Sequence, residues 1–556
     1  DVEFLCKDNK KKQYTMKNIK ILDCTLRDGG RIINCAFPDH EIKDISHRLA
    51  SANIDVIEIG FLRDSKNVEY KGNSTFFTDV DQIRPFVDKT KGTKYVAFVD
   101  YELFDWSTLK PYDGTSIDGI RVGWKKDSFV HHKDEIVKHL KEVKEKGYML
   151  YIQGVNTLGY TDRELLDILD FVNQIHPDGF GIVDTYGAMY MDDVDRIYTM
   201  VDHNLDEDIA IDFHSHNNYQ LSFAFAQEII RLSNGKRDIL IDGTLHGMGK
   251  VAGNLNTELI VDYLVRKRNF DYNFDAILDL IDDYIHPYQL QYKWGYSVPA
   301  LMAGIYKSHP NNILYLTEKF RLATKDIKYI ISMIDPQKRM SYDYDNIQRL
   351  YQEYNNIKVD DSVALENLKK QLEGRNILLI MPGSSIVEYK NLISQYIEDN
   401  NAKVILVNFI DKEYQTSDYI TFWGSKKRYD KYKELCIDVK SVVTSNVATD
   451  NNEDLVINYD SYIDRTEEYS DNTSLMLLKV LQRIGITSFA IAGFDGFKEQ
   501  GSYFNENNYK EVRFSSKYDE INKAISKLLK KYADSLDETS HIKFLTPSIF
   551  SNILEK

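Results

Sequence analysis

The chain of 556 residues is 43% hydrophobic and 28% charged, and it carries a formal net charge of -16 at pH 7. This length predicts two or three domains with sizeable cores, and the composition excludes a disordered or fibrous chain. The negative charge argues against a nucleic-acid binder and against a protein that binds anionic membranes, because both need a positive surface.

Residues 1–18 are mostly polar and are predicted to form an N-terminal tail. Over residues 19–268, short apolar runs alternate with amphipathic stretches of helical periodicity. The runs cover residues 19–26, 55–61, 94–100, 119–124, 149–155, 179–187, 209–216 and 239–247. Eight parallel strands, each followed by a helix, predict an α/β fold of the (β/α)₈ TIM-barrel type. The rival is a doubly wound open sheet, which usually has fewer strands and a GxGxxG turn that is absent here.

The pattern changes after the barrel. Residues 269–355 are predicted to form a helical extension packed on the barrel, and residues 356–375 a charged linker helix. β-like runs return at residues 377–385, 403–409, 419–425, 455–459 and 488–496. They predict a separate Rossmann-like α/β domain over residues 376–556.

Cysteine usage and hydropathy bear on location. The four cysteines include no CxxC pair, which favours a reduced cytoplasmic protein. No apolar run reaches about 18 residues and no signal-peptide pattern is present, so we expect neither a membrane span nor classical export. The sequence leaves open whether the chain is a monomer or forms a homo-oligomer.

Polar residues at the ends of the predicted barrel strands are the candidates for chemistry, because catalytic groups of a parallel barrel lie at that rim. Asp28 follows the first strand, and His214 and His216 close the seventh. Residues i and i+2 of a strand point to the same face, so both imidazoles can face one point. Barrel closure brings the first and seventh strands within one strand of each other. Two imidazoles and a carboxylate predict a divalent-metal site with open positions.

Four motifs in chain order, DCTLRDGG, IEIGF, HSHNN and GMGKVAGNLNTE, together resemble the DRE-TIM metallolyase superfamily. The helical stretch with WGYSVPALMAG is most similar to the accessory region of the 4-hydroxy-2-oxovalerate aldolase branch. The resemblance implies Mg²⁺ or Mn²⁺ bound by Asp28, His214 and His216, with Asn254 a direct ligand in some relatives. It also implies that Arg27 stabilises the enolate oxygen of a 2-oxoacid.

One position departs from this family pattern. Aldolases of the group usually carry a histidine shortly after RDG as the acid/base, where this chain has Arg31. Arginine stays protonated at any working pH and cannot accept the substrate's hydroxyl proton. His246, after the eighth strand, is the first candidate to replace it, and Tyr296 is the second. A structural role is the alternative for His246.

Further polar residues are expected near the barrel mouth. Arg31 and Arg121 are candidates to clamp a substrate carboxylate or phosphate, and a salt bridge inside the barrel is the alternative for Arg121. Glu58 is expected to contact a metal-bound water or to orient Arg27, unless it is a structural acid. Asn156 and Asp184, at the ends of the fifth and sixth strands, are expected to line the mouth. Arg31, Glu58, Arg121 and Asn156 form the predicted substrate site.

The C-terminal domain carries one suggestive loop. MPGSS follows an apolar run and precedes a helical stretch, which resembles a phosphate-binding strand–loop–helix. It predicts a nucleotide or nucleotide-sugar site at Gly383, Ser384 and Ser385. The stretch DNTSLMLLKVLQRIGITSFAIAGFDGF is similar to Rossmann-like domains of some bacterial surface-glycan proteins. A structural scaffold or a partner-docking domain is the alternative.

The sequence thus predicts a metal-dependent aldolase that cleaves or forms a 4-hydroxy-2-oxoacid through a pyruvate-like enolate. Its partners would be a small 2-oxoacid and an aldehyde. A Claisen condensation that uses an acyl-CoA is the nearest enzymatic alternative. A non-catalytic barrel that serves as a scaffold for the C-terminal domain is the other.

Overall fold

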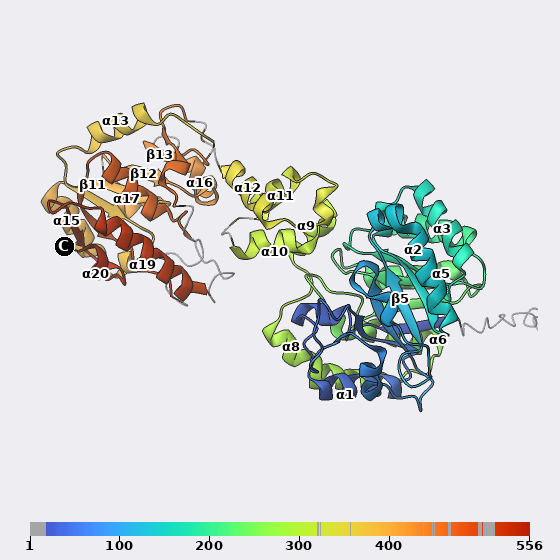
Figure 1. Ribbon diagram of the computed structural model, residues 1–556. Helices are drawn as coiled ribbons and strands as arrows, with labels where there is room; N and C mark the ends of the chain where they lie inside the picture. Colours follow the sequence, from blue (N-terminus) through green and yellow to red (C-terminus); the bar gives the residue numbers. More distant parts are fainter. Residues whose placement is uncertain are drawn as a thin grey trace, which may run out of the picture. The chain divides into compact units, whose positions relative to one another are not determined.

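The computed structural model describes residues 18–319, 322, 324–355, 357–416, 418–436, 439–447, 449, 451–464, 469–498, 503 and 517–555. The predicted tail therefore lies outside the described residues except for its last position. The chain separates into two compact units with the boundary between Asp343 and Tyr344 (Figure 1). Among the described residues, no helix is long and apolar enough to cross a membrane.

The first unit is built on a closed parallel sheet. Its strands are β1 (Ile19–Asp23), β2 (Val56–Leu62), β4 (Lys94–Asp100), β5 (Gly119–Gly123), β6 (Met149–Gly154), β7 (Gly179–Asp184), β8 (Ala210–Ser215) and β9 (Ile239–Gly243). β1 pairs with both β9 and β2, which closes the barrel. The TIM-barrel prediction is confirmed. A two-residue strand that the sequence did not predict, β3 (Phe76–Phe77), pairs in parallel with the end of β2.

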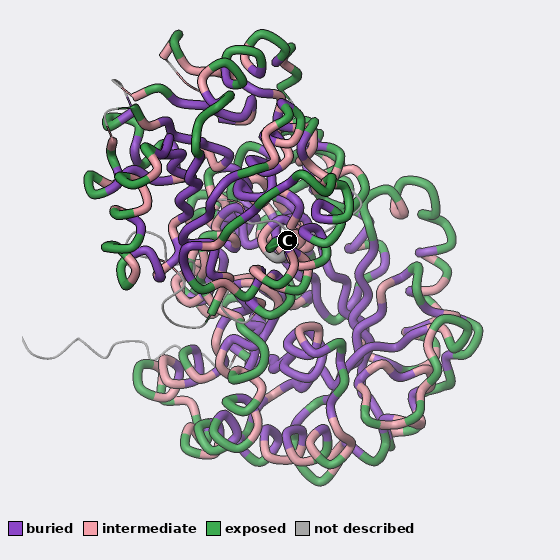
Figure 2. Tube along the Cα trace, turned by 90° about the vertical axis from the view of Figure 1, so that its left-hand side faces the viewer, coloured by how far each residue is buried: buried purple, intermediate pink, exposed green. Residues whose placement is uncertain are grey.

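Helices connect most but not all of these strands. They are α1 (Asp39–Ser51), α2 (Lys126–Glu145), α3 (Asp162–Ile175), α4 (Met191–Asn204), α5 (Ser222–Ser233) and α6 (Thr257–Arg268). The connections after β2 and β4 contain 3₁₀ turns in place of the expected α-helices. Pro85 lies inside the turn η2 (Val80–Phe86), where a longer α-helix would lose a backbone hydrogen bond. Figure 2 shows the buried strands in purple, with more exposed helices around them.

A helical extension continues the first unit. It comprises α7 (Phe274–Leu280), the π-turn η7 (Ile281–Ile285), α8 (His286–Gln291), α9 (Val298–Tyr306), α10 (Pro310–Lys319) and α11 (Thr324–Met333). The Tyr288 hydroxyl donates to Glu41 of α1 at 2.7 Å. Asn218, in the loop after β8, donates to the Ala300 carbonyl of α9 at 2.9 Å. The extension therefore packs on a barrel helix and also on a strand-end loop at the mouth.

The second unit contains a parallel sheet in the order β14-β13-β12-β11-β10-β15-β16. Its strands are β10 (Ile377–Ile380), β11 (Lys403–Val407), β12 (Ile420–Trp423), β13 (Ser441–Thr444), β14 (Leu455–Ile457), β15 (Ser488–Ala492) and β16 (His541–Phe544). Two of these strands, β13 and β16, were not predicted. Ile377 and Leu379 enter one core, and Leu378 and Ile380 enter the other. This alternation shows that both faces of the sheet are covered.

Helices supply those covers. They are α13 (Ser362–Leu372), α14 (Ser385–Glu388), α15 (Lys390–Asn400), α16 (Lys426–Tyr432), α17 (Thr473–Arg483), α19 (Tyr518–Asp534) and α20 (Ser551–Leu554). The second unit also contains α12 (Tyr344–Asn355), which contributes none of its described residues to these two cores. The chain first extends the sheet from β10 to β14 and then returns to place β15 on the other side of β10. The carboxyl ends of β10 and β15 thus form a topological switch point, where parallel α/β sheets commonly bind ligands.

Candidate active site

The predicted metal ligands converge at the mouth of the barrel. Asp28 lies in the loop after β1, while His214 belongs to β8 and His216 follows it. Asp28 Oδ2 is 3.9 Å from His214 Nε2 and 3.5 Å from His216 Nε2. One potential ligand atom from each residue lies within 4.8 Å of the other two. The three side chains can therefore contact a single ion.

The charge states also suit a cation. Burial lowers the pKa of His214 to about 3, so its imidazole is neutral at pH 7. Its Nδ1 lies 2.9 Å from Asp242 Oδ2, which orients the ring with Nε2 toward Asp28. Burial alone would raise the pKa of Asp28, but Arg27 and the hydrogen bond with His216 hold it well below its usual range. A neutral imidazole and an ionised carboxylate are the forms that bind metals.

Asn254 adds a fourth group to the same place. It forms an isolated antiparallel bridge with His216, and its side-chain nitrogen donates to the Met248 carbonyl at 3.0 Å. Its Oδ1 is buried and has no hydrogen-bond partner among the described residues. An unpaired buried acceptor is costly unless something binds it. A carboxylate, two imidazoles and an amide oxygen form a donor set that fits Mg²⁺ or Mn²⁺.

A second group of three potential ligands consists of Cys24, His214 and Asp242. One ligand atom of each also lies within 4.8 Å of the other two. Burial raises the pKa of the Cys24 thiol well above its usual value, and this thiol lies 3.3 Å from the Gly243 carbonyl. A protonated thiol is a poor ligand, and the side of His214 that faces this group already contacts Asp242. The cluster around Asp28 is therefore the better cation site.

Arg27 lies directly beside the cluster. Its Nη1 donates to Asp28 Oδ1 at 2.6 Å and its Nε to Glu58 Oε2 at 2.5 Å. The guanidinium carbon sits 4.7 Å from the centre of the Phe98 ring. Its Nη2 makes no hydrogen bond to the described residues and is left for another acceptor. Glu58 has no exposed surface, and its hydrogen bond holds Arg27 from inside the barrel.

Arg121 is also fully buried and lies in a charged layer inside the barrel. Its guanidinium donates to Glu58 at 3.1 Å, to Asp242 at 2.7 Å and to Asp212, and it also contacts Gln153 at 3.1 Å. These contacts match the internal salt bridge that was the alternative interpretation of Arg121. Through Glu58 and Asp242, this layer supports both Arg27 and His214.

The residues proposed for proton transfer have different surroundings. His246 contacts the rings of His286 and Trp294, and its Nδ1 lies 3.8 Å from Glu258. These neighbours belong to or follow the helices α6 to α8, and none is part of the metal cluster. Tyr296 is 55% exposed. The structure therefore brings neither residue into contact with Asp28, His214 or His216.

Sequence reasoning missed a histidine at the mouth. His309 precedes α10, and its ring centre lies 4.8 Å from that of Tyr342. Burial and the positive charges of Lys250 and Arg31 lower the pKa of His309 to about 4. The histidine is thus within electrostatic range of Arg31 although it is far away in sequence. No motif surrounds it that could have revealed this.

The remaining predicted residues also lie at strand ends. The Arg31 side chain is 39% exposed and its Nε is 3.3 Å from Asp28 Oδ1. Asn156 adopts a positive φ of 56° and donates from Nδ2 to the Met340 sulfur at 3.2 Å. Asp184 is buried and accepts from the backbone of the following loop, and burial raises its pKa to about 6. Arg31 contacts the cluster, whereas Asn156 contacts the extension.

Residues 109–283 match the HMGL-like family. This match and the aldolase relatives make the barrel similar to lyases of the DRE-TIM metallolyase type. Within this class, a 4-hydroxy-2-oxovalerate aldolase of Carboxydothermus hydrogenoformans is 26% identical over 323 residues, which are 56% of this chain and 90% of that protein. The corresponding aldolase of Pelotomaculum thermopropionicum is 25% identical over 314 residues, 56% of this chain and 89% of that protein. Among solved structures, the N-terminal domain of a protein described as an aldolase, from Bacteroides vulgatus, is 24% identical with a TM-score of 0.45. The match covers 54% of this chain and 97% of the solved chain.

Proposed function

We propose that the barrel cleaves or forms a 4-hydroxy-2-oxoacid through a pyruvate-like enolate, with Mg²⁺ or Mn²⁺ held by Asp28, His214, His216 and Asn254. The observation that carries the proposal is the cluster of potential ligands with the free Nη2 of Arg27 beside it. The aldolase relatives support the same reaction class.

The chemistry divides between the ion and the chain. When bound, the ion supplies a Lewis acid that polarises a ketone oxygen. Arg27 donates a charge-assisted hydrogen bond from Nη2 to that oxygen as negative charge develops on it. Glu58 and Asp28 hold the guanidinium at 2.5 Å and 2.6 Å, so little reorganisation is needed during the reaction. Arg27 is the enolate-stabilising residue in this proposal.

Proton transfer is assigned to His309 in preference to His246. With its pKa lowered to about 4, His309 is neutral at pH 7 and can accept the proton of a substrate hydroxyl. The charges of Lys250 and Arg31 act on that pKa, which supports a place for His309 near the same mouth. This assignment supplies the acid/base that Arg31 cannot be.

The cations around Arg31 define the substrate further. Arg31 and Arg63 approach Asp100 at 4.0 Å and 2.6 Å, and both lie over the Phe61 ring. Burial and the neighbouring charge of Arg31 lower the pKa of Lys250. Three cations near one another favour an anion between them. We assign them to a carboxylate or phosphate of the substrate.

Isotope exchange tests the proposal. Pyruvate incubated in D₂O with the protein and Mn²⁺ should incorporate deuterium into its methyl group, as followed by mass spectrometry, because enolisation releases those protons. Asp28→Ala should abolish both exchange and Mn²⁺ binding. Asp238→Ala, at an exposed ion pair with Lys20, is the control and should keep both. The proposal is lost if pyruvate and a panel of other 2-oxoacids show no exchange while Asp28→Ala binds Mn²⁺ like the wild type.

A further inference from the structure

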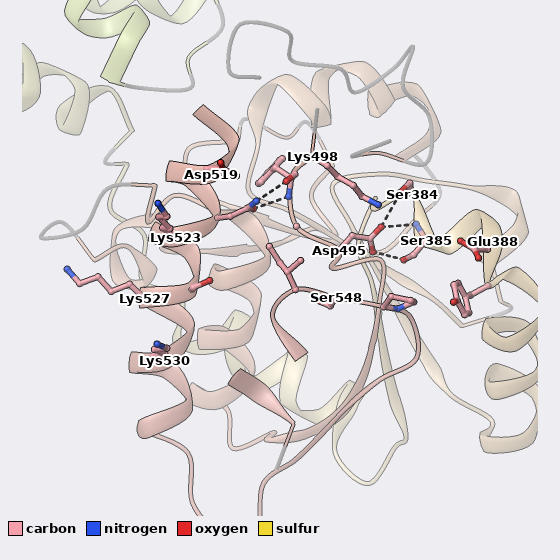
Figure 3. A pocket seen from close by; sticks show the side chains of 17 residues that line it. Ser384, Ser385, Glu388, Asp495, Lys498, Asp519, Lys523, Lys527, Lys530 and Ser548 are labelled. Atoms are coloured by element: carbon pink, nitrogen blue, oxygen red, sulfur yellow. Dashed lines mark hydrogen bonds between the residues drawn. The ribbon is translucent and has the colours of Figure 1, made fainter. Parts of the chain in front are cut away.

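The second unit has an open cleft of about 1120 Å³ at the switch point of its sheet. Loops that follow β10, β15 and β16 form one side of it and α19 forms the other (Figure 3). The predicted residues Ser384 and Ser385 line this cleft, and Gly383 immediately precedes them. The cleft exceeds a single phosphate by far and is large enough for a nucleotide-sized ligand.

The loops that line the cleft are closely fitted together. Ser385 donates to Asp495 from its backbone nitrogen at 2.8 Å and from its hydroxyl at 2.5 Å, and Ser384 donates to the same carboxylate at 3.3 Å. A Cβ on Gly383 would lie 2.4 Å from the Gly493 carbonyl oxygen, so only glycine fits there. Asn522 of α19 bonds both backbone groups of Phe497. The switch point is therefore held in one arrangement before any ligand arrives.

This arrangement changes where an anion could bind. The Ser385 amide, which the strand–loop–helix pattern would offer to a phosphate, is already used by Asp495. The helix that follows, α14, has four residues and ends at Glu388. A phosphate at this loop would also meet the charge of Asp495. Attraction for an anion must therefore come from another part of the cleft.

The lysines of the cleft supply that attraction. Lys523, Lys527 and Lys530 project from successive turns of α19, and Lys498 follows β15 (Figure 3). From Lys523 to Lys530 the helix rises about 10 Å, which is longer than one phosphate group. The lining also contains three carboxylates, but Asp495 among them is bonded to the serines. A row of cations this long matches a diphosphate better than a single charge.

The other end of the cleft is suited to a different chemistry. Glu388 and the hydroxyl of Ser384 can bond sugar hydroxyls, and Tyr389 offers aromatic surface. From the lysine row at one end and these groups at the other, we propose that the cleft binds a nucleoside diphosphate, either free or as part of a larger diphosphate ester. This site is independent of the reaction in the barrel.

Calorimetric titration of the full chain tests the site. The probes are ADP, GDP, UDP and CDP, with inorganic pyrophosphate and adenosine for comparison, in EDTA and again with Mg²⁺. At least one nucleoside diphosphate should bind, and binding should weaken as NaCl rises because the contact is ionic. Lys523→Gln with Lys530→Gln should weaken it at least about tenfold, or about 1.4 kcal/mol, because the double variant removes two of the cations that would contact the diphosphate.

Lys531→Gln is the matched control. It removes a neighbouring lysine of α19 that pairs with Asp464 and does not line the cleft, and affinity should stay within about twofold. Both variants change exposed side chains, so their melting temperatures should match the wild type. The proposal fails if none of the four nucleotides binds, or if the double variant binds as tightly as the control. Equal affinity for pyrophosphate and every nucleotide would overturn the assignment of the nucleoside.

Discussion

Replacing Arg27 by lysine separates geometry from charge at the centre of the proposed site. Arg27 donates from Nε to Glu58 and from Nη1 to Asp28, and these two bonds leave Nη2 available at the mouth. A lysine has a single ammonium group and cannot reach both carboxylates while also bonding a substrate oxygen. The positive charge remains, so the buried Glu58 keeps a cation nearby, and Arg121 still contacts it at 3.1 Å.

The expected effect is a loss of enolate stabilisation. Removal of one oriented donor to a developing oxyanion lowers rates by about 10²–10³-fold, or roughly 2.7–4 kcal/mol. Deuterium exchange into pyruvate should therefore slow by about this factor in Arg27→Lys, as measured by mass spectrometry. Mn²⁺ affinity should change by less than about tenfold, because Asp28 and both histidines are retained. An exchange rate within threefold of the wild type, in a folded variant that binds Mn²⁺, would refute the role of Arg27.

Three further predictions concern neighbouring residues. Asp242→Asn should weaken Mn²⁺ binding by about 10–100-fold in calorimetry, because His214 loses the carboxylate that orients it; unchanged affinity would contradict this. His309→Gln should slow cleavage of 4-hydroxy-2-oxovalerate by about 10²–10⁴-fold, whereas His246→Gln should remain near the wild-type rate, and the reverse order would move the acid/base to His246. Burial places the pKa of His214 at about 3, below the unfolded value of 6.5, so the unfolded chain binds the extra proton. Relative to His214→Gln, the metal-free wild type should therefore lose stability in urea titrations as pH falls from 6.5 toward 3, and a constant difference would refute this pKa.

The barrel could be predicted because each of its strands can be recognised from its own apolar residues. Strand β2, for example, is fully buried and apolar apart from Glu58 and Gly60, and most strands of the barrel lie one helix away from the next. The connections were harder to predict, since the turn around Pro85 depends on how the loop packs. In the second unit, β13 and β16 are short and only half apolar, with the sequences SVVT and HIKF, so no apolar run marks them. Short strands are specified by their partners more than by their own sequence.

The candidate site also contains residues that the sequence could place and residues that it could not. Asp28, His214 and His216 could be placed together because strand ends and barrel closure determine which residues meet at the mouth. His309 could not be placed there, because it belongs to the helical extension, and no sequence motif indicates how that extension packs. The bond between Ser385 and Asp495 joins positions 110 residues apart, and it changes a loop that resembled a phosphate site into one occupied by a carboxylate. Contacts between distant segments carry the part of the chemistry that local patterns omit.

A crystal structure of the protein with Mn²⁺ and oxalate, an analogue of the pyruvate enolate, tests the central claim most directly. The anomalous signal of manganese should lie between the Asp28 carboxylate and the Nε2 atoms of His214 and His216, with an oxalate oxygen within hydrogen-bond distance of Arg27 Nη2. Manganese at the group formed by Cys24, His214 and Asp242, or oxalate bound away from Arg27, would contradict the account.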